Sequence, residues 1–231
     1  MDIRTLHWDS DFFGLRVGCV DLQEKADAEQ LKSRQKELKQ QFDLLYVFDT
    51  NAVGFEADGA RLVDEKILYS KPCEPRKQYS DISFFQSQTP SGDLYRLALV
   101  SGGCSRFKLD ERLPKGSYER LYTCWIEKIC ANIGGGMQVL VFSNNAGVTQ
   151  GMITIGCQGE LGHIGLVAVD KDAQHQGIGG KIMSTLDGYL FEQGVKTLEV
   201  PTQKANSDAC RWYEKNGFVI QSKTPIYHWW L

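Results

Sequence analysis

A glycine-rich turn at residues 174–180 constrains this chain more than any other feature of its sequence. An apolar stretch ending at Val169 predicts a strand, a short polar loop follows, and the glycines open an amphipathic helical pattern over 177–192. The first amides of a helix have no internal partner and the helix dipole is positive there, so such a turn is suited to bind an anion. A purely structural turn uses the same glycines, and the turn alone does not separate the two interpretations.

Two common phosphate-binding patterns do not fit this turn. The dinucleotide fingerprint G-x-G-x-x-G requires a third glycine at the position that Ile182 occupies. The Walker pattern requires Gly-Lys followed by Ser or Thr, and this combination does not occur in the chain. The turn therefore belongs to neither of these two classes of nucleotide site.

A second segment gives the turn a context. The turn reads Gln174-x-x-Gly177-x-Gly179, and residues 206–218 read N-x-x-A-x-x-x-Y-x-x-x-G-F. Together the two segments resemble the acetyl-CoA loop (R/Q-x-x-G-x-G/A) and the following helix of the GCN5-related N-acetyltransferases (GNAT). One predicted strand, 197–201, separates them, as that family requires. The resemblance covers residues 137–231.

This resemblance implies acetyl-CoA as co-substrate, without a metal, bound where strands 163–169 and 197–201 splay apart. Pantetheine would pair with the first of these strands, and the pyrophosphate would lie on amides of the glycine turn. Tyr213 would protonate the leaving thiolate, a role that suits a phenol because its ordinary pKa is near 10. The residues implied to bind the cofactor are Leu166, Val167, Val169, Gln174, His175, Gln176, Gly177, Ile178, Gly179, Gly180 and Asn206.

The order of predicted elements indicates an α/β fold with a mixed (α+β) sheet and helices packed on it. A polar helix over 24–41 and a break at 71–92 place a domain boundary near residue 77. We therefore predict a small N-terminal α/β domain, 1–77, and a catalytic domain, 78–231. The later elements are predicted as helices 93–100 and 118–132, strands 137–143, 148–157 and 161–169, helix 177–192, strand 197–201, helix 207–215, and a strand pair at 218–220 and 226–230.

Four short motifs narrow the substrate. They are Trp8–Gly14, Ser105-Arg106-Phe107, Trp125-Ile126-Glu127 and Tyr227-His228-Trp229. They look like those of the TDP-fucosamine acetyltransferases, in which a truncated GNAT-like domain precedes the catalytic one. That resemblance implies acetylation of the amine of a TDP-linked 4-amino-4,6-dideoxyhexose, for surface polysaccharide synthesis. Ser105, Arg106 and Phe107 would bind this nucleotide sugar, since its phosphates call for Arg or Lys.

Two other functions stay open. The alternative to the nucleotide sugar is a GNAT enzyme that acetylates an amino acid, a peptide or protein N-terminus, or an antibiotic amine. An acidic acceptor cleft would favour polyamines or aminoglycosides, whereas a basic cleft containing Arg106 would favour the nucleotide sugar. A non-catalytic acyl-CoA-binding module is the third candidate.

The proton acceptor and the loop charge are also open. His163, Glu160 and Glu199 are candidates to take the proton of the amine, and a chain of waters is the alternative. Asp170 and Asp172 precede the glycine turn, where the resembled enzymes have basic residues or glycine. Two acids beside a pyrophosphate are tolerable only if they point to solvent.

Composition excludes several classes of protein. A net charge of −3 argues against a nucleic-acid-binding surface, and no apolar run is long enough to span a membrane. The first residues lack a signal-peptide pattern, and seven cysteines without a C-x-x-C pair favour reduced thiols in the cytoplasm. Trp229 and Trp230 should point to opposite faces of a strand, and an exposed one would suit a subunit contact in a homodimer.

Overall fold

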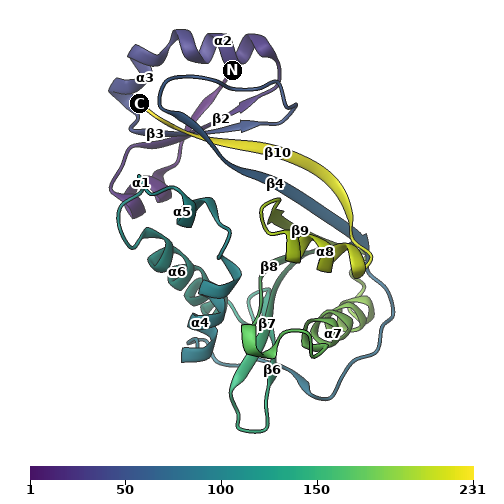
Figure 1. The fold of residues 1–231 in the computed structure, drawn as a ribbon. Helices are drawn as coiled ribbons and strands as arrows, with labels where there is room; N and C mark the ends of the chain where they lie inside the picture. Colours follow the sequence, from purple (N-terminus) through teal and green to yellow (C-terminus); the bar gives the residue numbers. More distant parts are fainter.

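A computed structural model describes residues 1–231 and contains one continuous ten-stranded mixed sheet (Figure 1). The strands, in their order across the sheet, are β1 (Ile3–Thr5), β2 (Val17–Leu22), β3 (Leu44–Asp49), β10 (Val219–Trp230), β4 (Ala60–Pro72), β9 (Thr197–Gln203), β8 (Leu161–Val169), β7 (Thr149–Gln158), β6 (Met137–Ser143) and β5 (Ile82–Phe84). The helices are α1 (His7–Phe13), α2 (Lys25–Ser33), α3 (Gln35–Gln41), α4 (Gly92–Ser101), α5 (Arg106–Leu109), α6 (Ser117–Ala131), the 3-10 turn η1 (Lys171–Ala173), α7 (Ile178–Glu192) and α8 (Ser207–Lys215). The predicted mixed α/β architecture is confirmed.

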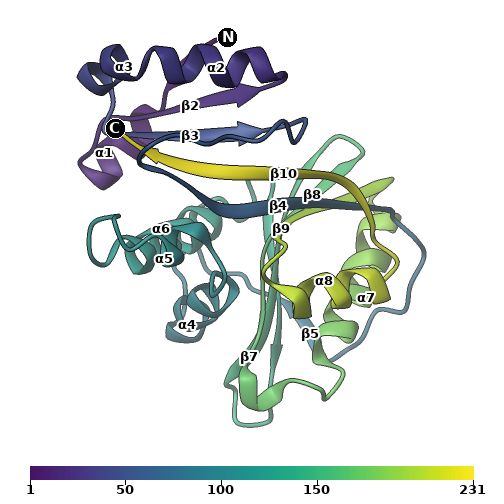
Figure 2. The same ribbon diagram turned by 45° about the horizontal axis from the view of Figure 1, so that its top comes forward.

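Helices cover the sheet in three groups (Figures 1 and 2). α4 and α6 lie on one face of β6–β8 and share a hydrophobic cluster with β2 and β3. α7 covers the opposite face together with α8, and α2 and α3 cover the N-terminal strands. None of the helices combines the length and the apolar character that a membrane span requires.

The C-terminal strand departs from the prediction. Residues 218–220 and 226–230 do not form a strand pair, because β10 is one long strand that hydrogen-bonds to β3 on one side and β4 on the other. Irregularities between Ile220 and Ser222 and between Ile226 and Tyr227 bend it. Pro225 lies just before the pairing with β3 begins, so its missing N–H disrupts only one edge. Pairing with β3 and β4 therefore outweighs the local turn preference of the residues between the two predicted strands.

The two predicted domains share the sheet. β10, assigned to residues 78–231, lies between β3 and β4 of the N-terminal part, and β4 pairs with β9. The segment after β4 is tied to α7 by a buried Lys71–Asp187 ion pair and by the amide of Tyr79, which donates to Thr185 Oγ1 at 3.0 Å. Gly188 allows this contact, since a Cβ there would collide with the carbonyl of Arg76. The boundary at residue 77 stays a prediction.

The terminal tryptophans are both engaged within the chain. Trp229 is fully buried, and Trp230 is half-buried with its Nε1 donating to Asp110 at 2.9 Å. His228 lies within 2.7 Å of the same carboxylate, and Arg112 donates to it at 3.0 Å. Neither indole is therefore an exposed anchor for a subunit contact, and the homodimer stays a prediction without this support.

Candidate active site

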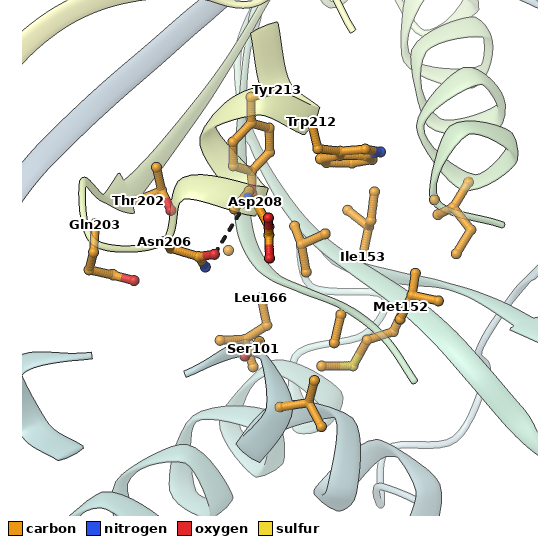
Figure 3. A pocket seen from close by; sticks show the side chains of 18 of the residues that line it. Ser101, Met152, Ile153, Leu166, Thr202, Gln203, Asn206, Asp208, Trp212 and Tyr213 are labelled. Carbon is orange, nitrogen blue, oxygen red and sulfur yellow. Dashed lines mark hydrogen bonds between the residues drawn. The ribbon is translucent and has the colours of Figure 1, made fainter. Parts of the chain in front are cut away.

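The gap predicted between two strands is present. β8 and β9 pair only through Leu161–Thr197, Gly162–Leu198 and His163–Glu199, and then diverge. A cavity of about 1080 Å³ opens beyond the last pair. In Figure 3, Tyr213, Asn206 and Asp208 reach it from α8, with Leu166, Met152 and Ser101 opposite.

A bulge in β8 explains where the divergence begins. Ile155 opposes Ile164, but Ile153 opposes Val167, so β8 carries one extra residue over this interval. The amide of Leu166 is turned out of the ladder and donates to Thr154 Oγ1 at 2.8 Å. The side chain of Leu166 lines the cavity, and Val167 and Val169 are the strand residues beyond it that also line the cavity.

The glycine turn forms one wall of the cavity. Gly177 is the N-cap of α7 with φ +80°, a left-handed conformation that favours glycine, and no side chain caps the helix. The amides of Ile178, Gly179 and Gly180 are therefore free of intrahelical partners at the positive end of the helix dipole. A Cβ on Gly180 would meet nothing within 4 Å. This end of α7 is an open cradle for an anion.

The two glutamines of the turn hold the loop itself. Gln174 Nε2 donates to the carbonyl of Val169 at 3.1 Å, and Gln176 Nε2 donates to that of Asp172 at 3.1 Å. Gln174 still lines the cavity, but Gln176 does not. The role of Gln176 toward the proposed cofactor is therefore indirect, through the loop conformation that its hydrogen bond stabilises.

The acids before the turn do not face the cradle. Asp170 pairs with Arg96, which also binds Asp93 at 3.0 Å and the carbonyl of Thr149 at 3.0 Å. Asp172 lies exposed on η1, and neither acid lines the cavity. The departure from the resembled loop is thus accommodated by one ion pair and by solvent.

Helix α8 positions the predicted acid and its neighbours. Asn206 is the N-cap, and its Oδ1 accepts a hydrogen bond from the amide of Ala209 at 3.3 Å (Figure 3). Tyr213 is buried between the rings of Tyr69 and Phe218, whose centroids lie 5.8 and 5.5 Å away. Burial raises the pKa of Tyr213 well above its ordinary value, so the phenol keeps its proton at neutral pH.

Comparison with known families agrees with this geometry. Residues 135–220 match the family model described as Acetyltransferase (GNAT) domain. This part of the chain is a GNAT acetyltransferase domain. It contains the glycine turn, β8, β9 and α8, so the cradle and Tyr213 both lie within it. A search of curated proteins gives no match to the chain.

Solved structures share the fold at low sequence identity. A GCN5-related N-acetyltransferase from Sphaerobacter thermophilus is 16% identical with a TM-score of 0.51, covering 80% of this chain but only 59% of its own length. A conserved protein of unknown function from Staphylococcus epidermidis is 16% identical with a TM-score of 0.61, and the match covers 94% of this chain and 85% of that protein. A tandem GNAT protein of the clavulanic acid biosynthesis pathway is 12% identical with a TM-score of 0.56, and the match covers 92% of this chain and 74% of that protein. The shared fold therefore extends beyond the GNAT domain to the N-terminal part.

The predicted acceptor residues meet the cavity at its other end. Ser105 is the N-cap of α5, with its Oγ accepting from the amide of Phe107 at 3.3 Å. The guanidinium carbon of Arg106 lies 4.4 Å from the centre of the Phe107 ring and 5.2 Å from that of Tyr46. Arg106 Nε is buried without a hydrogen-bond partner, and burial lowers the pKa of this side chain. A partly buried arginine from outside residues 135–220 thus lines the same cavity as the GNAT domain.

The structure brings together fourteen of the fifteen predicted site residues around one cavity, Gln176 being the exception. The three candidate proton acceptors lie elsewhere. His163 Nδ1 is 3.7 Å from Glu199 Oε2, Glu160 pairs with Lys196, and none of the three lines the cavity. Their placement at the closed end of the β8–β9 pair explains this, because side chains there lie before the strands separate.

Sequence reasoning missed Asp64 and Lys66, which line the cavity from β4. Burial raises the pKa of Asp64 to about 6, although the positive field of Arg106 lowers it. The available signal was a charged triplet, Asp64-Glu65-Lys66, between the apolar pairs Leu62-Val63 and Ile67-Leu68. Charged residues at a central strand point to solvent or to a site.

Asp64→Asn should raise the melting temperature of the ligand-free protein at neutral pH by about 2–4 °C. The pKa of Asp64 is about 6 in the folded protein against an ordinary 3.8, so the folded state binds the proton of this carboxyl more tightly. The stability of the folded protein is therefore undiminished below pH 4, where Asp64 is protonated in both states, and it falls as pH rises through 6 and Asp64 becomes charged. Thermal unfolding followed by circular dichroism should show the gain at neutral pH and none near pH 4. Glu65→Gln, which removes a carboxylate paired with Lys204, is the matched control. A lower melting temperature of Asp64→Asn at neutral pH would contradict this account.

Proposed function

We propose that this chain transfers acetyl from acetyl-CoA to the amino group of a nucleotide-linked amino-dideoxy sugar, a TDP-4-amino-4,6-dideoxyhexose, in surface polysaccharide synthesis. The observation that carries the acceptor class is Arg106, a partly buried side chain in the cavity whose Nε is buried and lacks a partner. A desolvated cation of this kind is costly unless an anion joins it, and a diphosphate supplies that anion.

The cofactor half of the proposal follows from the cradle and the splayed strands. The free amides at the start of α7 suit the pyrophosphate of CoA, and the exposed edge of β8 suits the amides of pantetheine. This arrangement directs the thioester toward the region between Tyr213 and the acceptor end. Holding both reactants in one cavity supplies much of the rate acceleration expected of such an enzyme.

Direct transfer needs no covalent enzyme intermediate. The neutral amine attacks the thioester carbonyl carbon, and the carbon–sulfur bond breaks as the tetrahedral intermediate collapses. The leaving thiolate takes the proton of Tyr213, and the proton lost by the nitrogen restores the phenol through solvent. Because its pKa is raised, Tyr213 is fully protonated when the amine attacks.

An amine acceptor without a phosphate is the second candidate, and Asp64 favours it because a carboxylate attracts any cationic amine. A non-catalytic acyl-CoA-binding module gains no support from the cavity, since a binding role alone requires no tyrosine at the reacting end.

Arg106→Gln should separate these acceptors. With acetyl-CoA saturating, thiol release should be measured with TDP-linked 4-amino- and 3-amino-dideoxy sugars, an amino acid, and an aminoglycoside. We expect turnover of a TDP-sugar, and a KM for it that is about tenfold or more higher in Arg106→Gln, the loss expected for a charge-assisted phosphate contact.

The control is Arg61→Gln, which removes an exposed arginine of the same strand as Asp64 and should leave the KM unchanged. Turnover of only the phosphate-free amines would reject the nucleotide sugar and keep the acetyltransferase. Failure of the wild type to bind CoA would reject the whole proposal.

A further inference from the structure

Two opposite charges face the acceptor end of the cavity from different elements. Asp64 comes from β4 and Arg106 from α5. Each shifts the pKa of the other, so their charges interact, but the two side chains do not form an ion pair. Because both side chains line the same cavity without bonding to each other, one ligand in the cavity can contact both.

Neither charge is satisfied by the surrounding protein. Arg106 Nε is buried without a partner, and its neighbours on both sides are the rings of Tyr46 and Phe107. Asp9 on α1 also acts on the charge of Arg106, but it does not line the cavity. Asp208, the other carboxylate that lines the cavity, pairs with Arg211. Asp64 is thus the lining carboxylate without an ion pair, and it shares the cavity with the unpartnered Nε of Arg106.

We propose that Asp64 and Arg106 form a two-point site that takes an acceptor bearing both charges, with the ammonium group on Asp64 and a phosphate on Arg106. This inference rests on the proposed function and assigns Asp64 as the residue that recognises and orients the amine. It also explains why a strand of the N-terminal part, outside the GNAT domain, completes the acceptor end.

The same carboxylate is placed to take a proton from the bound amine. The ammonium group loses one proton to Asp64 and becomes the neutral nucleophile, and Asp64 later releases that proton to solvent. A carboxylate with a pKa of about 6 accepts it more readily than an ordinary aspartate does. The charged and titratable groups around Asp64 are Glu65 and Lys66 on β4, Arg106 on α5 and Tyr122 on α6.

The test uses simple probes rather than the full substrate. Binding of ω-aminoalkyl phosphates of increasing chain length should be measured calorimetrically on the full chain saturated with CoA, beside alkyl phosphates of equal length. The wild type should prefer the amino compound of one length by about tenfold or more. Asp64→Asn should abolish this preference while keeping its affinity for the alkyl phosphate, and Glu65→Gln should retain the preference.

A pH series adds a readout that a structural role would not move. The preference of the wild type should fall as pH drops through about 6, because protonation removes the charge of Asp64. Arg106→Gln should weaken both series of compounds alike. A preference that persists in Asp64→Asn, the absence of any preference in the wild type, or equal phosphate binding in Arg106→Gln would each overturn the two-point site. These measurements report binding and not turnover. Absence of thiol release with every amine would therefore reject the proposed function without deciding whether the two-point site binds its ligand.

Discussion

Tyr213→Phe should lower kcat by about two to four powers of ten and leave the affinity for CoA unchanged. The substitution removes only the hydroxyl, and the ring keeps its packing between Tyr69 and Phe218. Since burial raises the pKa of Tyr213, the wild-type phenol keeps its proton at neutral pH and can donate it. Without it the thiolate must leave unprotonated or take a proton from water. Thiol release at saturating acetyl-CoA and acceptor measures the effect.

The matched control for this substitution is Tyr95→Phe. It removes an exposed hydroxyl that donates to Glu127 at 2.9 Å, and Tyr95 does not line the cavity. Its kcat should equal that of the wild type. The wild-type profile should also lack a descending limb up to about pH 10, because a raised pKa keeps Tyr213 protonated on the alkaline side. An unchanged kcat in Tyr213→Phe would assign the proton to solvent and remove the tyrosine from the mechanism.

The elements of the proposed cofactor site could be predicted from the sequence because their signals are local, whereas acetyl-CoA itself was implied by the resemblance to the GNAT family. A strand end, a glycine turn and a helix start follow one another within residues 169–180, and the spacing alone fixes the direction of the free amides. Helix 207–215 likewise follows from a capping Asn206 and from the Asn216-Gly217 stop. In such segments, propensity, capping and amphipathic pattern agree.

The acceptor side was only partly accessible, because it is assembled from distant segments. Arg106 was predicted from a short motif, but Asp64 becomes its neighbour only through the register of a sheet that joins β4 to β9 and inserts β10 beside it. No local pattern specifies that the last strand lies between β3 and β4. The error at 218–230 and the omission of Asp64 therefore have one origin, the non-local pairing of strands.

Gly180→Glu should weaken CoA binding about 100-fold or more while stabilising the protein. A Cβ at this position meets no other protein atom within 4 Å, and glutamate is a better helix former than glycine by up to about 1 kcal/mol. A carboxylate in the first turn also suits the helix dipole. The same carboxylate would occupy the cradle proposed for the pyrophosphate, and like charges forced together cost several kcal/mol. Calorimetric titration with CoA and thermal unfolding measure the two effects.

Gly92→Glu provides the comparison that isolates the cradle. Gly92 is the exposed first residue of α4, a Cβ there also meets nothing within 4 Å, and the position does not line the cavity. The same side chain at the start of another helix should therefore give a similar gain in stability without any change in the dissociation constant for CoA. If both variants bound CoA as the wild type does, the start of α7 would be a structural turn. Loss of binding in both would indicate a general effect of the added charge, so only a difference between the two variants assigns the anion to Gly177–Gly180.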